Sequence, residues 1–150
     1  MNNVFDNAFQ ELTAKMVEIA FEFVHHNSEE VDHIYLYASM EGGCSYNVFY
    51  SINGQLVKLH KVNTVLKKPC DISTERMFRL LTQGNSYLKE MTALFQQDNR
   101  DVPTLMQLVY APATGKLDNK ISYGLQFTNS RTKTSKDVFD AWFEAVKAES

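Results

Sequence analysis

Two cysteines and four histidines are the residues of this chain that most readily suggest catalytic chemistry. Cys44 and His60 fall on or beside neighbouring predicted strands, where an antiparallel sheet could set a thiol nucleophile beside an imidazole base. The sequence shows no oxyanion-hole element and no third group to orient the base. A lone cysteine at the start of a strand is usually a small apolar filler. We therefore expect no catalytic residue, and a small enzyme using Cys44 and His60 remains an alternative.

Metal binding is the second chemistry that the histidines suggest. His25 and His33, with Glu29 or Asp32, would supply ligand types that zinc accepts. Their spacing fits no common zinc pattern. His25 and His26 close a predicted helix, where a protonated imidazole complements the negative end of the helix dipole. We therefore expect exposed histidines at a helix end, with no metal site and no cofactor.

The common local signatures of enzymes are missing from the sequence. It contains no GxGxxG, GxxxxGK[ST], HExxH or GxSxG pattern. It has six glycines, and no glycine-rich loop precedes a predicted helix to hold a phosphate. These absences favour a protein that is not an enzyme.

Acidic residues are concentrated at the start of the chain. Residues 1–32 contain seven acidic residues and one basic residue, Lys15, whereas the whole chain of 150 residues has a net charge of −3. An acidic first helix would attract a basic partner and speed its encounter. The simpler interpretation is a solvated face of an amphipathic helix.

A basic segment beside predicted tyrosine-rich strands suggests another alternative, a sheet that stacks single-stranded nucleic acid. A dedicated nucleic-acid-binding domain is usually basic, and this chain lacks an RNP-like aromatic signature, so we do not expect nucleic acid as a partner. The residues that define this alternative are Lys58, His60, Lys61, Lys67 and Lys68, with Tyr35, Tyr37, Tyr46 and Tyr50.

Hydrophobic periodicity predicts the elements that must position these residues, in the order α-β-β-β-α-β-β-α. Asn53-Gly54 predicts a type I′ hairpin turn, and Gly84-Asn85-Ser86 predicts a break or kink inside the second helix. Helices are expected over 4–26 and 75–96, with a third opened by a capping box at 134–137; strands are expected over 33–39, 44–52, 55–62, 104–110 and 119–127. This pattern predicts one α+β domain over residues 1–150, with an antiparallel five-stranded sheet and helices packed on it.

The sequence also favours one compartment. No CxxC occurs, and the N-terminus lacks the basic start and apolar run of a signal peptide. No apolar stretch reaches the ~18 residues of a membrane-spanning helix. We therefore expect a cytoplasmic protein with reduced cysteines and no membrane association; the sequence predicts no particular oligomeric state.

Several short segments resemble one family. EVDHIYLYA at 30–38 follows a long helix and precedes VFY at 48–50. TLMQLVY at 104–110 is followed by TGKL at 114–117 and ISY at 121–123. Over about residues 5–125 the chain resembles the YezG-like antitoxins, bacterial proteins that neutralise toxins, commonly nucleases. Immunity proteins of contact-dependent growth inhibition systems are a related possibility.

The resemblance implies an immunity protein that binds a cognate toxin domain and occludes its active site. A nuclease groove is basic, so an acidic face on the inhibitor would complement it. The expected contact residues are Glu18, Glu22, Glu29, Glu30 and Asp32, with Tyr35 and Tyr37 as aromatic anchors.

Overall fold

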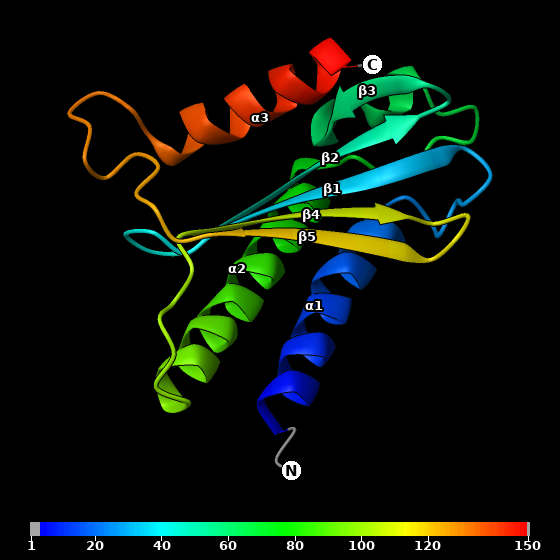
Figure 1. Ribbon diagram of the computed structural model, residues 1–150. Helices are drawn as coiled ribbons and strands as arrows, with labels where there is room; N and C mark the ends of the chain where they lie inside the picture. The colour runs from blue at the N-terminus through cyan, green and yellow to red at the C-terminus, as the bar shows by residue number, and fades with distance from the viewer. Residues whose placement is uncertain (1–3, 150) are drawn as a thin grey trace.

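The computed structural model describes residues 4–149, which form a five-stranded antiparallel sheet with helices on both faces (Figure 1). The predicted α+β class and the predicted order of helices and strands are confirmed, with one 3₁₀ helix, η1, added. The elements are α1 (Val4–Phe23), β1 (Val31–Ser39), β2 (Ser45–Ile52), β3 (Gln55–Lys58), η1 (Leu59–Thr64), α2 (Thr74–Gln97), β4 (Leu105–Ala111), β5 (Lys116–Ser122) and α3 (Ser135–Glu149).

The sheet has the order β3-β2-β1-β4-β5, so the first three strands form a meander and the last hairpin joins it beside β1. Asn53 and Gly54, between β2 and β3, have φ angles of 50° and 77°. A type I′ turn requires a positive φ at both central residues, so the predicted hairpin turn is confirmed.

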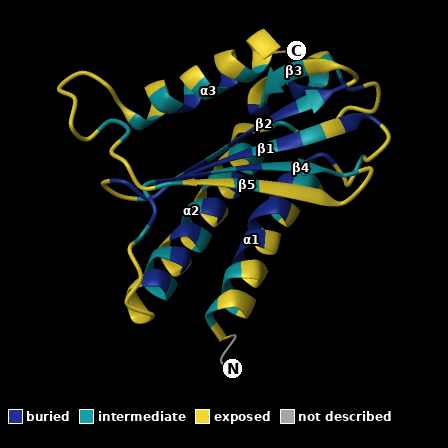
Figure 2. Ribbon diagram, in the orientation of Figure 1, coloured by how far each residue is buried: buried dark blue, intermediate teal, exposed yellow. Residues whose placement is uncertain are grey.

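Helices α1 and α2 cover one face of the sheet and bury their apolar stripes against it (Figure 2). Two tyrosines of β2 reach through this layer to α1. The hydroxyl of Tyr46 donates to the carbonyl of Met16 at 2.8 Å, and that of Tyr50 donates to the carbonyl of Ala20 at 2.7 Å. Burial raises the pKa of both hydroxyls well above the usual value, so they are protonated donors at neutral pH.

Helix α2 runs unbroken through Gly84-Asn85-Ser86, so the break or kink predicted there is wrong. Gly84 is instead the point where the ring of Tyr46 crosses α2. A Cβ atom at Gly84 would lie 2.1 Å from the Cδ1 atom of that ring. The side-chain carbonyl of Asn85 accepts the backbone N–H of Tyr46 at 2.7 Å. Gly84 and Asn85, which suggested a helix break, therefore form the contact between α2 and β2.

Helix α3 packs on the opposite face over a smaller aromatic core. Phe49 lies at its centre, with ring centroids 5.7 Å from Phe139, 4.9 Å from Trp142 and 5.1 Å from Phe143. The predicted capping box opens this helix: Thr134 N–H donates to Asp137 Oδ2 at 2.8 Å, and Asp137 N–H donates to Thr134 Oγ1 at 3.3 Å. The sheet therefore carries two helices on one face and one on the other.

Two predicted boundaries near the first helix and third strand are wrong. Helix α1 ends at Phe23 because His25 and His26 adopt left-handed φ angles of 56° and 54°, which no α-helix contains. Strand β3 ends at Lys58 because the chain turns into η1, which buries Leu59 and Val62 in the larger core.

Strand β5 was predicted over 119–127 but spans Lys116–Ser122. The hairpin loop is shorter than expected because the N–H groups of Thr114 and Gly115 both return to the carbonyl of Ala111. Beyond Ser122 the chain leaves the sheet. Glu41 holds the departing segment by accepting the N–H groups of residues 126–128 and the hydroxyl of Thr128.

The approach of Tyr46 to α2 makes Gly84 a sensitive position. We expect Gly84→Ala to lower the free energy of unfolding by about 1–3 kcal/mol, because overpacking against a buried ring outweighs the gain in helix propensity. Urea denaturation followed by far-UV circular dichroism measures this change. Ser86→Ala, on the exposed side of the same helix, is the control and should be neutral or slightly stabilising. A stable Gly84→Ala protein would contradict the packing described here.

Candidate functional site at the C-terminal end of α1

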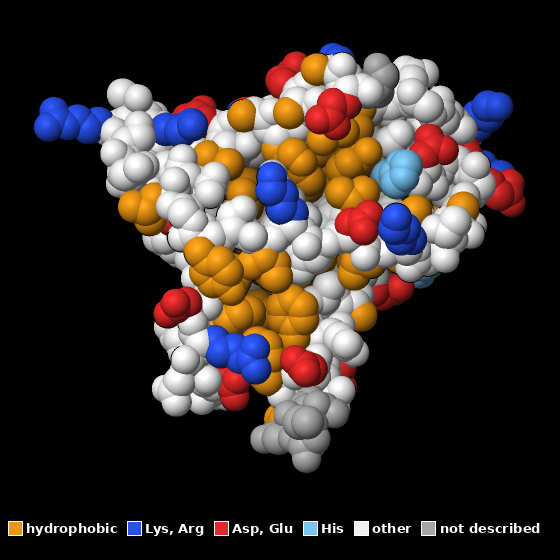
Figure 3. All heavy atoms as spheres, in the orientation of Figure 1, with side chains coloured by type: hydrophobic (Ala, Val, Ile, Leu, Met, Phe, Trp, Pro, Cys, Tyr) orange, Lys and Arg blue, Asp and Glu red, His pale blue; other side chains and the backbone are white. Residues whose placement is uncertain are grey.

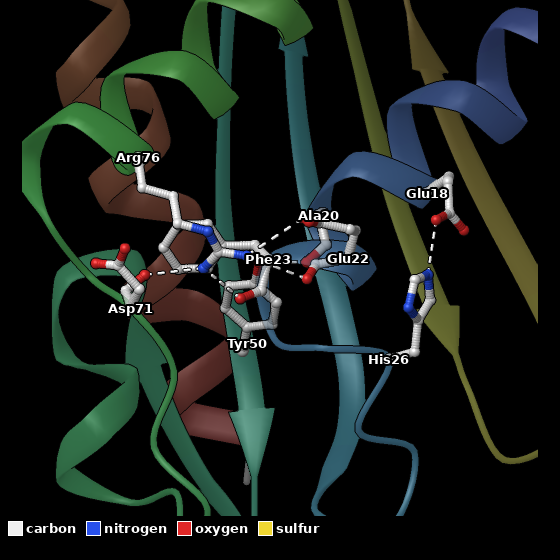
Figure 4. A network of polar contacts seen from close by, with 8 residues as sticks. All are labelled: Glu18, Ala20, Glu22, Phe23, His26, Tyr50, Asp71 and Arg76. Carbon is white, nitrogen blue, oxygen red and sulfur yellow. Dashed lines mark hydrogen bonds and ion pairs between the residues drawn. The ribbon is translucent and has the colours of Figure 1, made fainter.

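Arg76 organises the end of α1 from the first turn of α2 (Figure 4). Its Nη1 atom donates to the carbonyls of Phe23 and Asp71, each at 2.8 Å, and its Nη2 atom donates to the carbonyl of Glu22 at 3.3 Å. The guanidinium also lies 4.4 Å from the ring centroid of Phe23. The last carbonyls of a helix lack partners within the helix, and a cation there complements the helix dipole. Arg76 therefore serves as the C-terminal cap of α1.

Two exposed carboxylates on α1 stand beside this cap, and each contacts a basic side chain. Glu22 Oε2 lies 3.2 Å from Arg76 Nη2, and Glu18 Oε2 lies 2.6 Å from His26 Nε2. The side chains of Glu18 and Glu22 are 59% and 60% exposed. Exposed ion pairs contribute little to stability, so a cation of another molecule can replace His26 beside Glu18 at small cost, while Arg76, which is 16% exposed, keeps its contacts with the helix carbonyls.

A shallow groove of about 330 Å³ separates α1 from α2 at this end of the molecule. Glu18 and Glu22 line it from α1, and Arg76 and Arg79 line it from α2. The exposed Glu29 lies in the turn after α1, in a neighbouring hollow that His26 also lines. The structure thus gathers three of the predicted contact residues, Glu18, Glu22 and Glu29, at one end of α1.

Glu30, predicted as a contact residue, is buried and fully occupied. Oε1 accepts from Asn53 Nδ2 at 2.9 Å and from the N–H of Lys67 at 2.6 Å. Oε2 accepts from Asn27 Nδ2 at 2.7 Å and from the N–H of Lys68 at 3.2 Å. These hydrogen bonds, that of the Lys67 N–H foremost, lower the pKa of Glu30 to about 2. The carboxylate ties together the α1–β1 turn, the β2–β3 turn and the segment after η1.

The two predicted aromatic anchors face α3 rather than solvent. Tyr37 is 1% exposed, and its hydroxyl donates to the carbonyl of Ser135 at 3.0 Å. Tyr35 is half-buried and stacks on Phe49 with ring centroids 4.5 Å apart. Both tyrosines lie on one face of β1, as the alternation predicted, but helix α3 covers that face.

Asp32 is exposed but lies at the β2–β3 hairpin rather than at the α1 groove. Its Oδ2 atom accepts from the N–H of Gly54 at 2.9 Å and from Ser51 Oγ at 3.4 Å. It therefore supports the hairpin turn, and it does not join Glu18 and Glu22.

The two residues of the alternative enzyme site have different surroundings. Cys44 is half-buried, and its Sγ atom lies 3.9 Å from Thr92 Oγ1 of α2. His60 is exposed in η1 and lines a hollow that Cys44 does not line. Within residues 4–149, no group of three histidine, cysteine or acidic side chains is arranged to hold a metal ion.

The aromatic surface that a base-stacking sheet would need is covered. Tyr37, Tyr46 and Tyr50 are all buried, and Tyr35 is half-buried under α3. Lys58 is paired with Asp140 at 2.8 Å. Within residues 4–149, these placements leave no row of exposed aromatic rings on β1 or β2, the two strands that would stack bases.

Sequence reasoning missed Arg76 and Glu41, which have the most extensive polar roles besides Glu30. A cation in the first turn of a helix interacts unfavourably with the dipole of that helix. An arginine at this position therefore indicates that its side chain contacts another element. Glu41 opens a Glu-Gly-Gly turn and looked like an ordinary loop acid. Burial would raise its pKa, but the hydrogen bonds from Thr128, Gln126 and Phe127 lower it to about 2.

No family model matches this chain, and no curated protein matches it. None of the helices in residues 4–149 has the length and apolar character needed to cross a membrane.

The depressed pKa values of Glu30 and Glu41 predict how stability depends on pH. Both are about 2 in the folded chain, against a usual value of 4.5, so the folded state binds fewer protons than the unfolded state. Their contribution to stability is complete above pH 4.5 and is lost as the pH falls toward 2.

Urea denaturation at a series of pH values tests this dependence. The stability difference between the unaltered chain and Glu30→Gln or Glu41→Gln should shrink as the pH falls through this range. Glu144→Gln, at an exposed position on α3, is the control for removal of a carboxylate. A constant difference from neutral pH to pH 2 would contradict the assignment of these carboxylates.

Proposed function

We propose that this protein is a bacterial immunity protein that binds a cognate toxin, such as a nuclease, in the cytoplasm and occludes its active site. The observation that carries the proposal is the set of exposed carboxylates Glu18, Glu22 and Glu29 at the C-terminal end of α1, which lie beside Arg76, Arg79 and Lys68. The resemblance of residues 5–125 to YezG-like antitoxins supports the same function.

These carboxylates are suited to a basic partner. Glu18 and Glu22 contact the basic side chains of His26 and Arg76 at 2.6 and 3.2 Å, so they already adopt positions that a lysine or arginine of a toxin would meet. Their present partners are His26 and Arg76, and the pairs are solvent-exposed on the acidic side. Exchange of the exposed pair of Glu18 costs little, a basic group of the toxin can contact the exposed oxygens of Glu22 beside Arg76, and the complementary charges steer the encounter.

The surface also has a rigid support. Arg76 fixes the end of α1 through the carbonyls of Glu22 and Phe23, and Tyr50 fixes the preceding turn through the carbonyl of Ala20. Contact residues on rigid elements lose less conformational entropy on binding than residues on loops. We therefore assign Glu18 and Glu22 to the core of the toxin contact and Glu29 to its rim.

The proposal is tested first by identifying the partner. The tagged chain, expressed in the bacterium that carries its gene, should retain one basic toxin domain at near-equal stoichiometry. Co-expression of the chain should then restore the growth of cells that express this toxin domain. Retention of nucleic acid in place of a protein, released by salt, would instead favour the nucleic-acid-binding alternative.

Charge reversal then tests the surface. We expect Glu22→Lys combined with Glu29→Lys to weaken the toxin complex roughly tenfold to a hundredfold, mainly at low ionic strength, because two favourable charges become repulsive. Isothermal titration calorimetry at two salt concentrations measures the change. Glu144→Lys makes the same charge change on α3, across the sheet, and should leave affinity unaltered. Equal affinity for both variants would exclude this surface.

A further inference from the structure

Strand β5 is an open edge of the sheet. It has seven residues without proline, and five of them are exposed (Figure 2). The other edge strand, β3, has four residues and runs directly into η1, so it offers little backbone for pairing. An edge strand presents free N–H and C=O groups that can pair with another strand.

The register shows which groups of β5 point away from the sheet. Ser39 lies opposite Leu105, and the N–H of Met40 donates to the carbonyl of Thr104 at 3.0 Å. Ser39 and Leu105 are therefore a non-hydrogen-bonded pair, and Leu105 directs its peptide groups toward β5. Because such pairs alternate, the outward N–H and C=O groups of β5 belong to Leu117, Asn119 and Ile121.

We propose that β5 pairs with β5 of a second copy of this chain, antiparallel and about a two-fold axis at Asn119. Asn119 is the middle residue of β5, and its outward N–H and C=O groups would meet those of its counterpart in a hydrogen-bonded pair. The pairing would join two five-stranded sheets edge to edge. The partner is a second copy because the sequence of β5 is complementary to itself in this register.

The charges of β5 carry this complementarity. On the face of β5 toward α3, the two-fold axis sets Asp118 opposite the partner's Lys120, and Lys120 opposite the partner's Asp118. Charges on an edge strand usually prevent self-pairing because like charges meet. Here opposite charges meet, in a non-hydrogen-bonded pair where side chains are closest. In the single chain the only ion pair described for either residue is the exposed contact of Asp118 with Lys116 at 3.9 Å.

The face of β5 toward α1 matches in the same register. Leu117 and Ile121 are 38% and 40% exposed, and the axis sets each opposite the other in the partner. Asn119 lies between them. Its Oδ1 atom is buried and has no hydrogen-bond partner within residues 4–149. Its Nδ2 atom lies 3.7 Å from Met106 Sδ. If the Asn119 side chain turns toward the strand edge, a second Asn119 amide directly opposite supplies both a donor and an acceptor.

The surroundings of β5 leave room for the second copy. Figure 3 shows charged side chains between two apolar areas, one below α3 and one between α1 and α2, and β5 runs between these layers in Figure 1. The hollow beside the strand is lined by Phe9 and Ala14 together with Leu117 and Asn119. Pairing therefore covers exposed apolar surface along with the strand edge.

Sedimentation velocity on the full chain, from micromolar to millimolar concentration, tests the pairing. We expect a concentration-dependent dimer. Asp118→Lys and Lys120→Asp, each alone, should raise its dissociation constant roughly tenfold to a hundredfold, because like charges then face each other twice. An equimolar mixture of the two variants should form a heterodimer of unaltered affinity, since opposite charges meet again. The double variant should likewise recover.

Matched variants on α2 separate the pairing from general charge effects. Glu90→Lys and Lys89→Asp change exposed residues by the same amounts and should not affect the dimer. A chain that stays monomeric at every concentration overturns the proposal. So does a dimer that ignores the changes at Asp118 and Lys120, or a mixture of the single variants that fails to recover. Each of these outcomes is readable without loss of fold, because both residues are exposed.

Discussion

The passage of the Tyr46 ring across Gly84 sets how α1 and α2 pack on the sheet. The ring leaves β2, crosses α2 where a glycine leaves space, and ends with its hydroxyl on the carbonyl of Met16 in α1. One side chain thus fixes the distance from the sheet to both helices. Tyr50 repeats the contact one turn further along α1, and Arg76 completes it at the helix end. The exposed acids of α1 are held in place by these buried donors.

The sequence specified the fold class well because the elements follow simple periodicity. Alternation in β1 and β2, the Asn53-Gly54 turn and the capping box at Thr134 are local signals, and all three are confirmed. Gly84 could not be read in the same way. A glycine in a helix looks like a break unless the side chain that fills its space is known, and Tyr46 comes 38 residues earlier. The extent of β5 was misjudged because Glu41, remote in sequence, removes residues 126–128 from the sheet.

The predicted contact residues divide according to backbone geometry that the sequence does not display. Glu18 and Glu22 fall on the exposed side of α1, as helical spacing implies. Glu30 follows them in the same acidic segment but turns inward, because three chain segments present N–H donors to it. Tyr37 is buried because α3, nearly a hundred residues later, returns to the face that it occupies. Clusters of like charge in a sequence therefore overstate the acidic surface of the folded chain.

The placement of the single tryptophan gives the two cores separate optical signatures. Trp142 packs edge-on against Phe49 and near Tyr35, within the small core under α3 and on the opposite side of the sheet from α1 and α2. Its fluorescence therefore reports the docking of α3, whereas far-UV circular dichroism is dominated by the two longer helices. A chain whose two signals change at different denaturant concentrations would be one whose α3 undocks before the main core opens. The aromatic cluster beneath α3 would then be exposed while the acidic end of α1 is still in place.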